Sequence, residues 1–266
     1  MFSRTTNFYA GCDVGSTTGK AVIMNEKKIL ATAIVESEID PEKTANNALI
    51  HAMAQVKGLE RLEDITYLVG TGYGRTEVPF AHKNVSEISC HALGAHFVDK
   101  KIKTIVDIGG QDIKGISLNG NGTVKEFVMN DKCAAGTGKF FEAMGRTFKM
   151  DLTDFSVLAG KAKKSIPVSS QCSVFAESEV ISLIGQKNSP ADIALGIHES
   201  VAKRCYTLLK RVGLNPRITI TGGCAKNKTL AKTLKQILKM NITELSVDPQ
   251  IMGALGAAIF ARENGK

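Results

Sequence analysis

The order of hydrophobic and polar positions divides the chain into two halves that begin in the same way. In each half, apolar runs predict two strands around a turn, then a third strand, and a further strand after a helical segment. The expected strands are two within residues 8–24, then 29–35 and 65–69 in the first half, and 103–108, 113–118, 124–129, 217–221 and a short strand near Leu245 in the second.

Other segments have the apolar spacing of amphipathic helices. They follow the third and fourth strands of the first half, and they dominate the second half after its third strand. Strands interleaved with helices in this way indicate an α/β protein. The expected helices are residues 42–57, 88–97, 135–148, 174–184, 191–212, 230–239 and 252–263.

The second half begins with the same elements as the first, and this internal repeat carries a recognisable motif. Asp13-Val14-Gly15 followed by Lys20 matches Asp107-Ile108-Gly109 followed by Lys114, so both halves carry Asp-x-Gly-x-x-x-x-Lys between two strands. A glycine at such a turn exposes backbone N–H groups that can hold phosphate oxygens. The aspartate can bind Mg²⁺, usually through water. One such turn is a common hairpin, whereas two at equivalent positions predict a nucleotide clamped from both sides of a cleft.

Three further features extend this interpretation. Ser16, Thr17 and Thr18 add hydroxyl donors to the first turn. The strand at 217–221 runs into Gly222-Gly223, which is either a plain helix-entry turn or a place where adenosine can approach the backbone. Small residues at 253–258 predict a closely packed helix that joins the lobes at a hinge. The G-x-x-x-x-G-K-S/T sequence of a P-loop is absent, which excludes that alternative phosphate cradle.

Length and charge narrow the function classes. The 266 residues, 43% of them hydrophobic, suffice for two lobes with their own cores. We expect a soluble, cytoplasmic protein, because there is no signal-peptide pattern and no run of roughly 18 apolar residues. The net charge of +8 indicates a solvated lysine-rich surface or attraction to an acidic partner or to phosphates. The chain has no Trp and few aromatic residues, so we expect no nucleic-acid partner, and no membrane partner either.

The two hairpins, the Gly-Gly turn and the small-faced helix, in this order, resemble the actin, hexokinase and heat-shock-70 ATPase superfamily. The resemblance implies two ribonuclease-H-like lobes, residues 1–97 plus 249–266 and residues 98–248, with ATP in the cleft between them. Asp13 and Asp107 would serve Mg²⁺ and the attacking water. By the same likeness, ATP contacts would come from Gly15, Ser16, Thr17, Thr18, Lys20, Gly109, Gly110, Gln111, Thr137 and Gly138, with Gly222 and Gly223 at the adenosine and Gln250 near the base.

Two of the six cysteines lie in unusual surroundings. Cys133 and Cys172 each stand just before an apolar helical segment, where the positive end of a helix favours negative charge. A cysteine at a helix start is usually structural, and the alternatives are a redox thiol or a metal ligand. An iron–sulfur cluster takes four thiolates, which a twofold dimer would supply from two per chain. The remaining cysteines are expected to be structural: Cys12, Cys90, Cys205 and Cys224.

The segments around these cysteines point to one family. Residues 107–112, 133–138 and 172–179, together with 70–75 and 222–227, resemble the activators of (R)-2-hydroxyacyl-CoA dehydratases almost from end to end. The ATPase subunits of benzoyl-CoA reductases share much of this pattern. The resemblance implies a homodimer with one [4Fe–4S] cluster, held by Cys133 and Cys172 of both subunits and reduced by ferredoxin or flavodoxin. ATP hydrolysis would then drive one electron onto the dehydratase.

Two other functions stay open at the level of sequence. A small-molecule kinase of the same fold would need a substrate-binding insertion, and none of convincing size is visible. A structural or regulatory actin-like protein would not need intact phosphate hairpins. In the electron-transfer interpretation, Gln111 is expected to sense the γ-phosphate, and the helices beside 109–111 and 136–138 to pass the change to the cluster.

Overall fold

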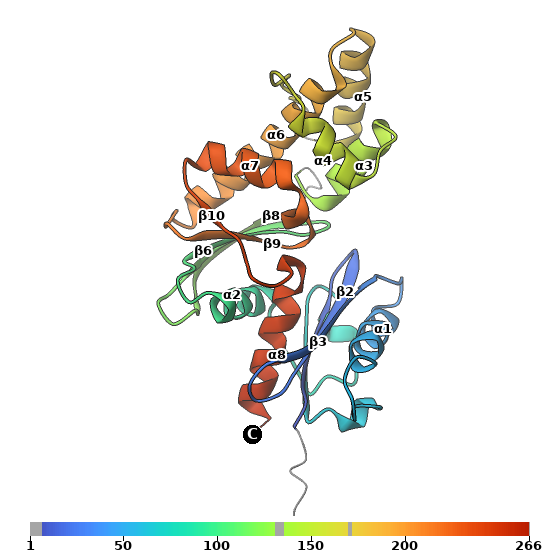
Figure 1. Cartoon of the computed structure of the whole chain (residues 1–266), viewed down its shortest axis with the longest axis vertical. Helices are drawn as coiled ribbons and strands as arrows, with labels where there is room; N and C mark the ends of the chain where they lie inside the picture. The colour runs from blue at the N-terminus through green and yellow to red at the C-terminus, as the bar shows by residue number, and fades with distance from the viewer. Residues whose placement is uncertain (1–6, 131–135, 170–171, 266) are drawn as a thin grey trace, which may run out of the picture. The chain divides into compact units, whose positions relative to one another are not determined.

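The computed structural model describes residues 7–130, 136–169 and 172–265, and Figure 1 labels most of their helices and strands. The chain divides into two compact units. The first comprises Met1–Lys101, Asn119–Val124 and Leu245–Lys266, and the second Ile102–Leu118 and Lys125–Glu244. Within the described ranges, no helix combines the length and the hydropathy that crossing a bilayer requires.

The first unit contains a five-stranded mixed sheet in the order β3-β2-β1-β4-β5. Helix α1 begins where the Asp40 side chain accepts hydrogen bonds from the N–H groups of Glu42 and Lys43, and Pro41 occupies its first turn. The elements are β1 (Tyr9–Val14), β2 (Thr18–Met24), β3 (Ile29–Glu36), α1 (Pro41–Met53), β4 (Tyr67–Thr71), β5 (Lys83–Asn84), α2 (Glu87–Val98) and α8 (Met252–Asn264).

The second unit contains a second five-stranded sheet, in the order β10-β9-β6-β7-β8, and five α-helices among its described residues. Its core combines residues of β6, β7 and β9 with the apolar faces of the helices, chiefly the long α6. The elements are β6 (Thr104–Ile108), β7 (Ile113–Leu118), β8 (Val124–Asn130), α3 (Gly138–Thr147), α4 (Leu152–Gly160), α5 (Ser173–Gly185), α6 (Pro190–Arg211), β9 (Ile218–Thr221), α7 (Lys228–Leu238) and β10 (Ile242–Thr243).

The two sheets have the same topology, which confirms the internal repeat. The first strand of each, β1 or β6, pairs antiparallel with the next strand and parallel with the strand that follows the helical segment. The register is also equivalent, because Asp13 lies opposite Lys20 and Asp107 lies opposite Lys114. The matching motifs in the sequence therefore mark matching positions in two similar sheets.

Three elements differ from the expectation from sequence. Helix α4 was not predicted, because only Phe155, Ser156 and Ala159 are buried in it and so few positions give no helical period. Strand β5 was also missed, since two exposed residues carry no alternation. The last strand was expected near Leu245 but lies at Ile242–Thr243, where the apolar signal is a single isoleucine.

Helix α8 packs closely on β1 and α2, as its small residues predicted. A Cβ atom added to Gly11 of β1 would lie 2.1 Å from the carbonyl oxygen of Ala254. One added to Gly94 of α2 would lie 2.3 Å from that of Met252, and one added to Gly256 of α8 would lie 1.9 Å from that of Cys90. Contacts this short leave no room for a side chain, so glycine at these positions allows backbone to meet backbone.

We predict that Gly256→Ala destabilises the protein by about 2 kcal/mol or more, because an extra methyl group overpacks a rigid backbone contact. The control is Gly185→Ala, at the end of α5, where an added Cβ meets no atom within 4 Å. That substitution should be neutral or stabilise by up to about 1 kcal/mol through helix propensity. Urea unfolding measures both variants, and equal effects would contradict the packing argument.

Candidate functional site

The first hairpin holds a nearly buried ion pair behind a tight turn. Lys20 Nζ lies 3.4 Å from Asp13 Oδ2, and the two side chains are 12% and 6% exposed. The N–H of Gly15 donates to the carbonyl oxygen of Thr18 at 3.1 Å and closes the turn. Gly72 presses against the same aspartate with a φ of +91°, and a Cβ there would lie 2.4 Å from Asp13 Oδ1. The carboxylate of Asp13 is therefore fixed on several sides.

The second hairpin repeats this arrangement with one more carboxylate. Lys114 Nζ lies 3.3 Å from Asp107 Oδ2 and 2.7 Å from Asp112 Oδ2, and its side chain is 2% exposed. The N–H of Gly109 donates to the carbonyl oxygen of Asp112 at 3.0 Å, which is the counterpart of the bond that closes the first turn. Asp112 was not among the site residues expected from the sequence, although the Gly-Gly-Gln-Asp string contains it.

The added carboxylate makes the two hairpins electrostatically different. Thr18 occupies in the first hairpin the position that Asp112 occupies in the second. The first hairpin thus pairs one lysine with one aspartate and offers neutral hydroxyl groups, whereas the second pairs one lysine with two aspartates. A neutral turn rich in N–H and O–H groups suits phosphate oxygens, and a site with excess negative charge suits a hydrated cation.

Several expected ATP contacts gather around the first hairpin. The side-chain amide of Gln250 donates to Thr18 Oγ1 at 3.3 Å, which places Gln250 beside this turn. Thr17 Oγ1 is buried and has no hydrogen-bond partner among the residues that the structure describes. Ser16 is exposed, and so is Gln111 in the second hairpin. Unused or accessible polar groups at both turns are consistent with a polar ligand there.

In each unit, the strand that pairs in parallel with the first strand, β4 or β9, ends in a threonine that is followed by a glycine. Sequence reasoning recognised only part of this repeat. Thr71 lies opposite Asp13, and Thr221 lies opposite Asp107. Thr221 Oγ1 donates to Asp107 Oδ1 at 2.8 Å. Gly222, with a φ of +83°, would place a Cβ 2.4 Å from the carbonyl oxygen of Ile108. The signal was the string Thr-Gly directly after a strand, present at both 71–72 and 221–222.

Between the turn at Gly222-Gly223 and α7, the side chain of Asn227 joins a network of hydrogen bonds. Asn227 begins α7 by accepting the N–H of Leu230, and it also accepts the Ser156 hydroxyl of α4 at 2.8 Å. Its side-chain nitrogen lies 3.0 Å from His198 Nε2, and His198 Nδ1 lies 2.7 Å from the carbonyl oxygen of Ala194. Burial lowers the pKa of His198, so the neutral ring donates through Nδ1 and accepts through Nε2.

The first turn of α3 is bonded directly to the second hairpin. The N–H of Gly138 donates to the carbonyl oxygen of Gly109 at 2.9 Å, and the N–H of Lys139 donates to that of Gly110 at 2.8 Å. The first N–H groups of a helix have no partner within the helix, so the hairpin satisfies them. Thr137, the residue before the helix, is fully buried. The expected sites 109–111 and 137–138 therefore meet in one place.

Within the described residues, one cysteine is exposed, three are buried and Cys224 is half-buried. Cys172 is exposed and occupies the N-cap position of α5, as predicted. Burial raises the pKa of the Cys90, Cys205 and Cys224 thiols to about 12 and raises that of Cys12 further, which agrees with their expected structural role. Cys133 lies outside the described residues. Within those residues, no three His, Cys, Asp or Glu side chains form a possible metal site.

We predict that Lys114→Met destabilises the protein by about 3 kcal/mol or more, because it leaves two neighbouring carboxylates without their buried cation. Lys125→Met is the control, since Lys125 is exposed on β8 and its loss should change stability by about 0.5 kcal/mol or less. Chemical denaturation at neutral pH compares them. A Lys114 variant as stable as the control would show that the ion pair does not support the hairpin.

Comparisons with known proteins agree with this geometry. The activator of lactoyl-CoA dehydratase from Anaerotignum propionicum is 44% identical over 257 residues, covering 95% of this chain and 96% of that protein. The structure of the activator of the 2-hydroxyisocaproyl-CoA dehydratase from Clostridium difficile with bound ADPNP has a TM-score of 0.91 at 39% identity, covering 97% of this chain and 95% of that one.

A glucokinase of the ROK family from Streptomyces griseus, at 13% identity, has a TM-score of 0.59 over 97% of this chain and all of that chain, so the likeness is one of fold alone. The actin-like ATPase fold expected from the motifs is thereby confirmed. The model of the BadF/BadG/BcrA/BcrD ATPase family matches residues 10–261. The chain belongs to the BadF/BadG/BcrA/BcrD ATPase family.

Proposed function

We propose that this protein hydrolyses ATP to drive one electron onto a (R)-2-hydroxyacyl-CoA dehydratase and so activates that enzyme. Membership of an ATPase family supports the first half of the proposal. The second half is supported by relatives that are activators of lactoyl-CoA and 2-hydroxyisocaproyl-CoA dehydratases and match nearly the whole chain. The hydrogen bonds between α3 and the second hairpin support the proposal that ATP hydrolysis is coupled to electron transfer.

The two hairpins are the proposed binding site for ATP and Mg²⁺. Backbone N–H groups of the glycine turns and the hydroxyls of residues 16–18 would hold phosphate oxygens. Asp13 and Asp107 would hold Mg²⁺ through water, while Lys20 and Lys114 keep each carboxylate in place. Gln111, exposed next to the turn glycines, would sense the γ-phosphate, and the two aspartates would also serve the attacking water. Gly222 and Gly223 remain the proposed adenosine contact.

The proposed [4Fe–4S] cluster is shared by a homodimer, with Cys133 and Cys172 of both subunits as ligands. Cys172 fits this role because its thiol is exposed and lies at the N-terminus of α5, which favours an anionic group. When bound, such a cluster accepts and donates single electrons. The proposed donor to this cluster is ferredoxin or flavodoxin. Cluster exposure of this kind also implies sensitivity to oxygen and an anaerobic setting.

The link between the nucleotide and the cluster is the first turn of α3. Its N–H groups at Gly138 and Lys139 bond to the carbonyls of Gly109 and Gly110, which belong to the proposed phosphate turn. A shift of that turn on loss of the γ-phosphate would move α3 with it. Cys133 precedes α3 by five positions in the sequence. The same turn can therefore respond to the nucleotide and displace a cluster ligand.

Two alternative functions differ from the proposed one, either in iron content or in the partner enzyme. A small-molecule kinase of this fold would bind ATP without iron. An ATPase subunit of a benzoyl-CoA reductase-type enzyme would bind iron but would serve a different reductase. The exposed cysteine at the N-terminus of α5 favours the iron-dependent functions over the kinase.

We predict that protein purified under strict anaerobiosis is brown and contains about four irons and four sulfides per dimer. Cys172→Ala should lose the iron and keep ATP binding, because Cys172 lies outside the hairpins. Cys205→Ala is the matched control and should keep the iron, since Cys205 is buried within α6. Iron and sulfide analysis with a nucleotide-binding assay measures both. Wild-type protein that stays iron-free after reconstitution would contradict the proposal.

A further inference from the structure

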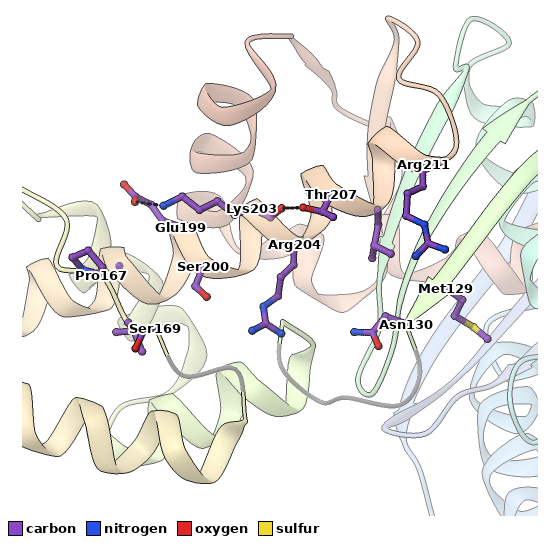
Figure 2. Close-up of a pocket in the computed structure, with 13 residues that line it drawn as sticks. Met129, Asn130, Pro167, Ser169, Glu199, Ser200, Lys203, Arg204, Thr207 and Arg211 are labelled. Carbon is purple, nitrogen blue, oxygen red and sulfur yellow. Dashed lines mark hydrogen bonds and ion pairs between the residues drawn. The ribbon is translucent and has the colours of Figure 1, made fainter.

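A cavity of about 560 Å³ opens in the second unit beside the end of β8, the middle of α6 and the segment before α5 (Figure 2). Among the described residues of its lining, three are cationic, Lys203, Arg204 and Arg211 of α6, and one is acidic, Glu199. Hydroxyl and amide groups make up most of the remaining polar lining. We call this cavity the basic pocket. The proposed nucleotide and cluster chemistry does not use it.

The two arginines of the basic pocket lie on one side of α6, whereas Lys203 points toward Glu199 (Figure 2). Arg204 and Arg211 are seven positions apart, so they share a face of the helix, and Figure 2 shows both projecting to the side of Asn130. Lys203 forms a pair with Glu199 at 3.5 Å, but its side chain is 66% exposed, so the pair leaves much of its charge available to a partner. The pocket therefore presents a band of positive charge about two helical turns long.

The basic pocket lies next to the proposed cluster ligands. Ser169, on its rim, precedes Cys172 by three residues, so the chain between them spans at most about 11 Å. The N–H and Oγ of Ser169 donate to Glu179 Oε1 of α5 at 2.9 and 3.0 Å, which ties the rim to the helix that begins at Cys172. Asn130, on the opposite side, precedes Cys133 by three positions in the sequence.

We propose that the basic pocket is the docking site of an acidic electron-carrier protein that reduces the cluster, an inference that rests on the proposed function. One electron leaves the reduced carrier and one enters the cluster, with no proton transferred. An acidic protein surface is complementary in charge to the basic pocket. The net charge of +8 on this chain would also attract such a surface over a long range. The second copy in the proposed homodimer meets this chain at the cluster ligands and carries the same net charge of +8, so it matches the basic pocket less well than an acidic protein does. Lys203 and Arg211 are exposed, as contact with a protein surface requires.

The test reverses the charge of two pocket residues without touching the nucleotide or cluster residues. Lys203→Glu with Arg211→Glu is compared with the control pair Lys210→Glu and Lys235→Glu, which makes the same change in net charge at exposed positions outside the pocket. Stopped-flow mixing with reduced ferredoxin measures the rate constant of cluster reduction. Biolayer interferometry of the cluster-free protein measures ferredoxin binding without electron transfer.

We predict that the pocket pair lowers both the association rate and the reduction rate at least about tenfold relative to the control pair at low ionic strength. The difference should shrink in about 0.5 M salt, where charges are screened within a few ångströms. Reduction by dithionite should be equal in all variants, because dithionite needs no docking surface. Iron content should also be unchanged.

Three results would overturn the assignment. Equal losses in both pairs would show that net charge alone matters. Loss of dimer mass in the pocket pair would make a second copy the occupant. Intact reduction by ferredoxin with lost activation of the dehydratase would make the dehydratase the occupant. Iron analysis of the wild-type protein tests the proposed function separately. If that function is wrong, the wild-type protein contains no iron.

Discussion

Two backbone hydrogen bonds connect the second hairpin to the first turn of α3. The first N–H groups of α3, at Gly138 and Lys139, donate to the carbonyls of Gly109 and Gly110 in the second hairpin. A helix start needs partners for these groups, and here the proposed phosphate turn supplies them. Any displacement of the turn must break these bonds or move the helix. In the proposed function, this constraint would make α3 follow any movement of the turn on loss of the γ-phosphate.

The turn itself is held by buried charge. Lys114 lies between Asp107 and Asp112 with its side chain 2% exposed, and Lys20 pairs with Asp13 in the equivalent position. Charged groups are costly to bury unless they are paired, so these pairs fix the strand ends where the turns begin. The extra carboxylate of the second hairpin makes the two copies differ in charge, because Lys114 meets two carboxylates where Lys20 meets one.

The sequence predicted the repeat, the strands around both hairpins and most helices, because these depend on periodic apolar positions and on motifs of fixed spacing. It also placed Cys172 at the start of a helix, since the apolar segment begins directly after it. It could not predict α4, whose three buried residues give no period, or the bonds from Gly138 and Lys139. A hydrogen bond from a backbone N–H does not depend on which side chain its residue carries, so the sequence does not reveal its partner. The role of Asp112 was missed because the first hairpin has Thr18 at the equivalent position, so the repeat gave no sign of a second carboxylate.

The central claim is that the bonds from α3 to the second hairpin couple ATP hydrolysis to electron transfer. Lys139→Pro removes one of these N–H donors at a position in the first helical turn where proline is tolerated. Lys139→Ala removes the same side chain, including its ion pair with Glu142, and keeps the donor. The measurement is the number of electrons delivered per ATP hydrolysed. The account predicts that the alanine variant stays coupled while the proline variant hydrolyses ATP with a yield at least about tenfold lower, as expected for loss of about 1.4 kcal/mol. Equal yields in the two variants would contradict it.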